Sequence, residues 1–274
     1  MLYNYFVMSK SIANILMKDV IRMTNLSKTS HVGGCLSCLN IIDVLYTEIM
    51  NIDNKNPKSQ KRDRFILSKG HTAAVVYSAL ANKGFFPKEL LDTFFEDGTM
   101  LPGHIDHKVP GVEFSTGSLG HGLAVGIGMA LSLRNKKSKS NVYVLLSDGE
   151  MNSGSTWESI MFAGHHKISN LICIVDKNSF QALGKTNKVI NLDPLDKKWK
   201  SFGWKTYDID GHDNKKIKSA LIAGKKSINK PTVVICNTIK GKGLKGFEGK
   251  LFSHYRPPTD KDLDNFVKVS SNEK

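Results

Sequence analysis

Three continuous apolar segments, separated by helical segments, constrain the fold of this chain more than any other feature. They are VYVLLS at residues 142–147, NLICIVD at 170–176 and PTVVICNTI at 231–239. Residues 155–167 and 214–226, which lie between them, are expected to form helices. Strands that are apolar on both faces and are joined by helices form a parallel sheet covered on both sides. We therefore predict an α/β fold with a doubly wound, mostly parallel sheet and helices on both faces.

The rest of the chain extends this pattern without a linker or a repeat. Apolar residues recur at helical spacing in the first half, and two more short strands are expected. The additional elements are helices at residues 9–24, 36–50, 72–83, 87–95 and 118–133 and strands at 65–67 and 204–209. For a chain of 274 residues we predict one domain over residues 1–258, followed by a polar tail, 259–274, that frays.

Composition narrows the classes of function. Lys and Arg number 39 against 25 Asp and Glu, for a net charge of +14, and only five of these cations are Arg. Proteins that bind nucleic acids use Arg and interleaved aromatic residues, which do not cluster here, so we expect a lysine-rich surface and no nucleic-acid partner. No run of about 20 apolar residues predicts a membrane span.

The cysteines and the N-terminal residues bear on location. Four cysteines are too few for a disulfide framework in a chain of this size, and Cys35 and Cys38 form a single CxxC pair with no second pair. The N-terminal residues have no basic region followed by an uninterrupted apolar run, so they do not predict a signal peptide. We expect a reducing, cytoplasmic location.

A carboxylate and an amide follow two neighbouring strands of the predicted sheet. Asp148 and Gly149 come directly after the strand at 142–147, and Asn178 follows the strand at 170–176. A strand-helix-strand unit places both strand ends at one edge of the sheet, where ligands of doubly wound sheets bind. Mg²⁺ takes one or two protein oxygens and completes its shell with phosphates and water. The spacing favours a magnesium-diphosphate site, although an Asp helix cap and an Asn turn residue would leave the same pattern.

The same residues resemble the transketolase family. Asp148-Gly149, a spacer of about 28 residues and Asn178 look like its thiamine-diphosphate fingerprint, and the spacer itself is similar to transketolases. Further segments match in the same order and carry the resemblance to about residue 258: SHVGG at 30–34, LSKGH at 67–71, PGH at 102–104, STGSLG at 115–120 and KGKG at 240–243, with His254. The resemblance implies the thiamine-diphosphate-binding fold of the family's diphosphate domain.

The resemblance also assigns roles by position. It implies that Asp148, Asn178 and the main-chain oxygen of Phe180 bind a metal ion, Mg²⁺ or else Ca²⁺ or Mn²⁺. The residues that it places against thiamine diphosphate are His71, Gly117, Leu119, Gly149 and Asn178. The histidines that it places in the active site, as catalytic residues, are His31, His71, His104 and His254. An imidazole can donate or accept a proton near neutral pH, which suits this role.

The family's activating glutamate, which contacts the cofactor's pyrimidine ring, lies on a second domain that this chain does not match. The chain therefore resembles the N-terminal subunit of a split transketolase. A C-terminal, pyrimidine-binding subunit would supply the glutamate, and the pair would form a hetero-oligomer of the type α2β2. We further expect the small residues Gly122, Gly126 and Ala130, on one helix face, to receive another backbone in that assembly.

The function implied is transfer of a two-carbon ketol unit from a ketose, or its phosphate, to an aldehyde. Two alternatives stay open: another thiamine-dependent synthase that forms C–C bonds in sugar metabolism, and a cofactor-binding module without catalysis. A nucleotide-binding oxidoreductase is disfavoured, since residues 241–246 fit GxGxxG but no helix follows them.

Some positions depart from the family pattern. Ser147 replaces the first Gly of the fingerprint, which is tolerable if its φ is negative. Lys177 stands where relatives often have Asn, and Ser153 replaces a glutamate that helps to connect the two active sites, whereas Glu158 of that network is retained. The residue after His254 begins an unusual sequence, Tyr255-Arg-Pro-Pro, and points to an unusual substrate.

Overall fold

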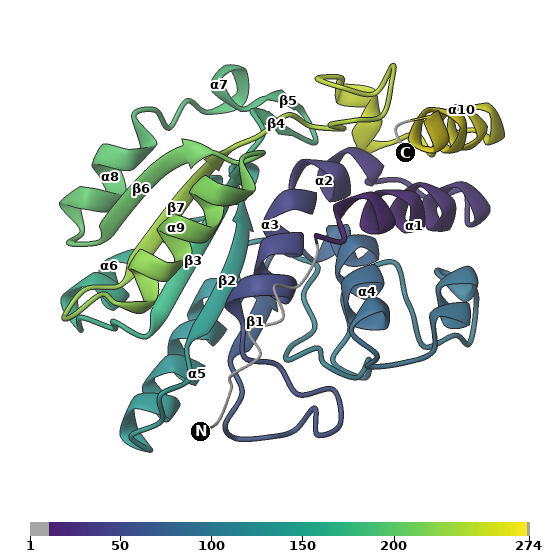
Figure 1. Cartoon of the computed structure of the whole chain (residues 1–274). Coiled ribbons are helices and arrows are strands. Elements are labelled where there is room, and N and C mark those ends of the chain that lie inside the picture. Colours follow the sequence, from purple (N-terminus) through teal and green to yellow (C-terminus); the bar gives the residue numbers. More distant parts are fainter. Residues whose placement is uncertain (1–10, 273–274) are drawn as a thin grey trace.

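The chain builds one five-stranded sheet in which every neighbouring pair of strands is parallel (Figure 1). The structure is a computed structural model that describes residues 11–272. The strand order is β1-β2-β3-β7-β6. The strands are β1 (Arg64–Leu67), β2 (Val142–Ser147), β3 (Leu171–Lys177), β6 (Lys205–Asp210) and β7 (Thr232–Asn237). The predicted α/β class and parallel sheet are confirmed.

Alternate side chains of the strands pack into two separate cores, one on each face of the sheet. Tyr143 and Ile172 lie in the first core, whereas Val144 and Cys173, one residue further along, lie in the second. This two-residue period explains why the central strands read as unbroken apolar runs. The first core is covered by α1 (Ala13–Leu26), α2 (Val32–Ser37), α3 (Leu39–Val44), α4 (Ala73–Asn82) and α9 (Asn214–Lys225), the second by α5 (Gly122–Asn135), α6 (Gly154–His165) and α8 (Leu195–Ser201).

Some predicted helices differ in detail. The segment 36–50, expected to be one helix, is divided among α2, α3 and a π-helical turn, η1 (Leu45–Ile49), with Cys38 outside helical geometry at φ −95° and ψ 9°. Residues 87–95 form a 3-10 helix, η3 (Lys88–Thr93), after Pro87. The start predicted for the first helix, at residues 9–10, lies outside the described residues.

The prediction that residues after 258 fray was wrong, because α10 (Asp260–Asn272) is a helix that packs along α1 (Figure 1). Leu263 and Phe266, one helical turn apart, lie against the first core. The amide of Asn25 donates hydrogen bonds to the main-chain oxygen of Pro258 (3.0 Å) and to Asp260 Oδ1 (2.9 Å). This segment is mostly polar, and its few apolar residues form one face of a helix, which the sequence pattern did not indicate. Whether residue 258 is a domain boundary stays a prediction.

The small-residue face of α5 packs on the chain's own sheet, which corrects the expectation for Gly122, Gly126 and Ala130. A Cβ added to Gly126 would lie 2.5 Å from Val144 Cγ2 in β2, and one added to Gly122 would collide with the side chain of Ser68. These glycines let α5 close on the sheet that it covers.

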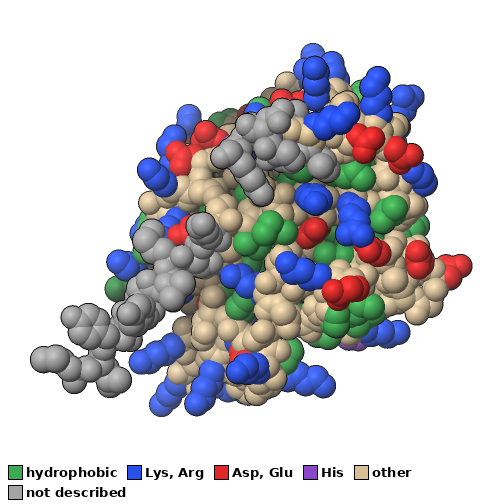
Figure 2. Space-filling model, turned by 45° about the vertical axis from the view of Figure 1, so that its right-hand side comes forward, with side chains coloured by type: hydrophobic (Ala, Val, Ile, Leu, Met, Phe, Trp, Pro, Cys, Tyr) green, Lys and Arg blue, Asp and Glu red, His purple; other side chains and the backbone are tan. Residues whose placement is uncertain are grey.

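The surface of the molecule carries many lysines with acidic residues among them, as the composition predicts (Figure 2). On the face seen in Figure 2, Lys and Arg side chains are spread widely, with Asp and Glu among them, and do not collect into one basic patch. Among residues 11–272, no helix has the length and apolar character needed to cross a membrane.

Candidate active site

The candidate site lies where four parallel strands end. Lys69 follows β1, Asp148 follows β2, Asn178 follows β3 and Lys240 follows β7. The register pairs Ser147 of β2 with Asp176 of β3, so the turns beyond them emerge at the same level of the sheet edge. A cavity of about 230 Å³ opens there. Of the residues predicted from the sequence, its lining includes His31, His71, His104, His254, Gly117, Leu119, Gly149, Asn178 and Phe180.

The predicted histidines form one cluster, although they come from four separate segments. The ring centroid of His31 lies 5.1 Å from that of His71, 5.9 Å from that of His104 and 4.8 Å from that of His254. Burial, followed by the charge of Lys240, lowers the pKa of His254 to about 3. Burial, followed by His104, lowers the pKa of His31 to about 4, and burial also holds the pKa of His71 well below its usual value. The imidazoles of His31, His71 and His254 are therefore neutral at pH 7.

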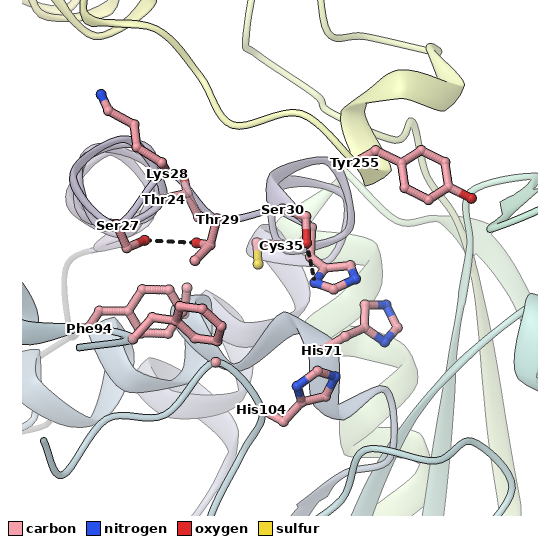
Figure 3. Close-up of a pocket in the computed structure, with 14 residues that line it drawn as sticks. Thr24, Ser27, Lys28, Thr29, Ser30, Cys35, His71, Phe94, His104 and Tyr255 are labelled. Atoms are coloured by element: carbon pink, nitrogen blue, oxygen red, sulfur yellow. Dashed lines mark hydrogen bonds between the residues drawn. The ribbon is translucent and has the colours of Figure 1, made fainter. Parts of the chain in front are cut away.

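A second cavity, of about 390 Å³, shares three histidines of the cluster with the first (Figure 3). In Figure 3 the rings of His71 and His104 stand along one side, and Phe94 lies across from them. Ser27, Thr29 and Ser30 add hydroxyl groups, and the Ser30 hydroxyl lies 3.1 Å from His31 Nδ1. The second cavity is therefore a hydroxyl- and imidazole-lined space that adjoins the first.

The donor atoms around Asp148 fit a hard divalent cation. Asp148 is buried; its Oδ1 accepts from the Gly149 N–H (2.9 Å) and its Oδ2 from the Ser179 N–H (2.6 Å). Burial first, and the charge of Asp176 second, raise the pKa of Asp148 to about 7, which a bound cation would reverse. The other two predicted donors are the Asn178 amide oxygen and the Phe180 carbonyl, so the predicted set consists of oxygens, which Mg²⁺, Ca²⁺ and Mn²⁺ prefer.

This donor set needs further ligands from outside the chain. Within the described part of the chain, no group of three or more His, Cys, Asp or Glu side chains is placed to hold a metal ion. One carboxylate and two neutral oxygens leave coordination positions for a diphosphate and water. Gly149 keeps the approach open, since a Cβ there would lie 2.8 Å from the Cβ of Gln181. The residues therefore fit a metal-bound diphosphate.

Two lysines in the lining of the first cavity supply positive charge, and the sequence analysis assigned neither a role. Lys69 is fully buried and pairs with Asp176; although burial lowers the pKa of Lys69, the Asp176 carboxylate outweighs it and raises the pKa. Lys240 is also buried, and burial first, followed by the charge of Lys69, lowers its pKa to about 8. An anion in the cavity would meet the ammonium group of Lys240, whereas the charge of Lys69 is balanced by Asp176.

Glu150 is a second buried acid whose structural role the sequence did not show. Its carboxylate accepts from the Ser68 hydroxyl, the Gly120 N–H (2.8 Å) and the Ser147 N–H (3.4 Å). It therefore ties the loops after β1 and β2 to the start of α5. Only its closeness to Asp148 in the sequence indicated that it lay near the site.

The departures from the family pattern have local explanations. Ser147 is the last residue of β2 and is not among the residues with positive φ, which was the condition for a serine in place of glycine. Its hydroxyl accepts a hydrogen bond from the Glu150 N–H (3.2 Å). Lys177 pairs with Asp193 (2.7 Å) outside the cavity lining. Glu158 is exposed on α6, and its part in a link between sites stays a prediction.

The fold and the cavity define a class of protein: an α/β domain with a histidine cluster and several oxygen donors at the carboxyl edge of its parallel sheet. The thiamine-diphosphate-binding domain of transketolase matches residues 8–269. The chain therefore belongs to the transketolase family, as the motifs predicted, and transketolases are transferases.

Relatives of two sizes share this domain. The chain is 43% identical to the 6-deoxy-6-sulfo-D-fructose transketolase subunit SqwG of Clostridium sp. (strain MSTE9), with 88% of each chain covered. It is 38% identical to one of the subunits of the apulose-4-phosphate transketolase of Phocaeicola vulgatus, covering 93% of this chain and 90% of the relative. The crystal structure of transketolase from Campylobacter jejuni superposes with a TM-score of 0.91 at 30% identity. The match covers 95% of this chain but 42% of that transketolase, so the chain spans about two fifths of it.

Proposed function

We propose that this chain is the diphosphate-binding subunit of a split transketolase. The observation that carries the proposal is the meeting of the histidine cluster with the oxygen donors of Asp148, Asn178 and Phe180 at one sheet edge. Relatives that match over nearly their whole length are called subunits, which supports a two-chain enzyme. The reaction proposed is transfer of a two-carbon ketol unit from a ketose or ketose phosphate to an aldehyde.

The chain would hold the cofactor through its diphosphate. Asp148, Asn178 and the Phe180 carbonyl would bind Mg²⁺, and Gly117, Leu119, Gly149 and His71 would contact thiamine diphosphate, with Lys240 opposing its charge. When bound, thiamine diphosphate supplies the nucleophilic carbon that makes and breaks bonds next to a carbonyl. A companion C-terminal subunit would supply the activating glutamate and the pyrimidine pocket, in an α2β2 assembly.

The neutral histidines would act on the substrate. A neutral imidazole donates from one ring nitrogen and accepts at the other, so His31 and His254 can bind sugar hydroxyls and move a proton at the carbonyl oxygen. His104, in the same cluster, would bind the substrate beside them. The adjoining second cavity gives a sugar chain room beyond the reacting carbons. The four cysteines are buried and free, which supports the cytoplasmic location.

The test is ketol transfer by the chain and its companion subunit together. With Mg²⁺ and thiamine diphosphate, transfer from xylulose 5-phosphate or a related ketose to an aldehyde is expected, whereas Asp148→Ala should abolish metal-dependent cofactor binding in a folded protein. Cofactor binding without transfer from any ketose tried would favour the binding module. Unchanged thiamine-diphosphate affinity in Asp148→Ala, at matched Mg²⁺, would remove the metal assignment.

A further inference from the structure

We propose that Asp176, paired with Lys69, is a positioning residue for the metal site: it fixes the amide of Asn178 so that the amide oxygen faces the cation. This inference rests on the proposed function, and it assigns a role to a carboxylate that neither the sequence motifs nor the donor set requires. Asp176 lies in β3, two residues before Asn178.

Asp176 is completely buried and saturated with hydrogen bonds. Its Oδ2 accepts from the Lys69 ammonium, from the Ser37 hydroxyl (2.5 Å) and from the Asn178 amide nitrogen (3.1 Å), and its Oδ1 accepts from the Thr238 hydroxyl. These donors come from α2, from the turns after β1 and β3, and from the segment after β7. One carboxylate thus joins the segments that form the site.

These contacts determine which way the Asn178 amide points. Its nitrogen lies 3.1 Å from Asp176 Oδ2 and 3.3 Å from Ser37 Oγ, and its oxygen accepts from the Phe180 N–H (3.1 Å). A flipped amide would turn its oxygen toward the Asp176 carboxylate and its nitrogen toward an N–H, so both interactions would become repulsive. Asp176 therefore leaves the Asn178 oxygen on the side of the Phe180 loop, where the metal is proposed to bind.

Lys69 makes this arrangement possible in the interior. A buried carboxylate needs a counter-charge, and the Lys69 ammonium supplies it while also donating to the Gly34 carbonyl (3.1 Å). Because the charges of Lys69 and Asp176 cancel, the pair adds no net charge beside Asp148. The cation is therefore held by its ligands and not by the charge of this pair. Partners that orient metal ligands from behind change metal affinity by about 10–100-fold when they are lost.

The decisive experiment is Mn²⁺ binding to the assembled enzyme, with thiamine diphosphate and without substrate, followed by the EPR signal of free Mn²⁺. Asp176→Asn is expected to weaken Mn²⁺ binding at least tenfold. The double variant K69M/D176N removes both buried charges together, so it avoids an unpaired Lys69, and it is expected to show the same weakening with a restored thermal midpoint of the metal-free protein. If the Lys69–Asp176 pair has only a structural role, the folded double variant should bind Mn²⁺ with wild-type affinity. That result would overturn the proposal.

Controls separate the possible failures. Asp208→Asn changes a carboxylate of β6 that accepts from Asn237 (2.5 Å) away from the site, and it should leave Mn²⁺ affinity unchanged. If neither Asp176 variant folds, Ser37→Ala decides, with about threefold weaker Mn²⁺ binding expected and unchanged affinity overturning the proposal. Because no substrate is present, wild-type Mn²⁺ binding without ketol transfer would contradict only the proposed activity, whereas transfer together with an unaffected double variant would contradict only the role of Asp176.

Discussion

Burial lowers the pKa of His31, His71 and His254, so these three rings are neutral, and this property sets how they can act. With pKa values of about 3 for His254 and about 4 for His31, protonation of these rings contributes nothing to turnover between pH 6 and 8. The rings can then serve as hydrogen-bond partners of sugar hydroxyls and as proton acceptors for a group that is generated during the reaction.

Removing these rings should therefore slow turnover more than it weakens cofactor binding. His104→Ala and His254→Ala are each expected to lower kcat of the assembled enzyme by about 10²–10⁴-fold, the range for a general acid or base. Thiamine-diphosphate affinity, measured by titration without substrate, should change much less. Lost cofactor binding combined with otherwise normal turnover would contradict these roles. His165→Ala, at the exposed end of α6, is the control.

Lys240 should make anion binding depend on pH. Its lowered pKa of about 8 means that it is charged below pH 8 and neutral above it. Affinity for thiamine diphosphate should then fall by roughly tenfold from pH 7 to pH 9, because a hydrogen bond to a charged group is worth about 1.5–3 kcal/mol. Lys240→Met should bind weakly at both pH values. Lys242→Met, on the same loop but half-exposed, should keep the wild-type profile; a flat wild-type profile would refute the assignment.

At the scale of residues, the sequence motifs predicted which side chains line the site. They did not predict which buried residues keep those side chains in place. The histidines and the metal donors could be named because the motif marks groups that contact a ligand. Lys69 and Asp176 are 107 positions apart, and no local pattern relates two such residues. Glu150 was missed for the same reason, since its partners lie in the loop after β1 and at the start of α5.

Among the elements, α5 offers a matched pair of glycines on opposite sides of one helix. Gly126→Ala should lower the free energy of unfolding by about 1–3 kcal/mol, because its Cβ would collide with Val144 of the buried strand. Gly128 is exposed and a Cβ there meets nothing within 4 Å, so Gly128→Ala should raise it by up to about 1 kcal/mol. Urea unfolding of the purified chain measures the change in the free energy of unfolding for both variants. Equal changes for Gly126→Ala and Gly128→Ala would refute the orientation of α5.

The elements that could be predicted are those with a strong period. Apolar runs located β2, β3 and β7 to within one or two residues, since burial on both faces confines polar residues to the ends of these strands. The short hairpin of β4 (Phe180–Gln181) and β5 (Gly184–Lys185) has no such signal. The helix α10 was missed because its apolar residues are few and its stability comes from packing on α1.

At the scale of the whole molecule, the proposed site is a half-site. The proposed diphosphate and metal ligands lie around the cavity among the described residues, and the acids nearest to it, Asp148, Glu150 and Asp176, are assigned to the metal or to buried hydrogen bonds. The purified chain with Mg²⁺ and thiamine diphosphate should therefore show no ketol transfer, and activity should appear when the companion chain is added in equimolar amount. Robust turnover by the purified chain would overturn the two-chain proposal.

The histidine cluster draws on segments from His31 to His254, and this span has a consequence for biosynthesis. A nascent chain that has emerged just past β3 already contains Asp148 and Asn178, yet it lacks β7, Lys240 and the last imidazole. The cavity takes shape only after nearly all of the polypeptide has left the ribosome. Chains that extend past His254 would then bind the cofactor, whereas chains truncated before β7 would not.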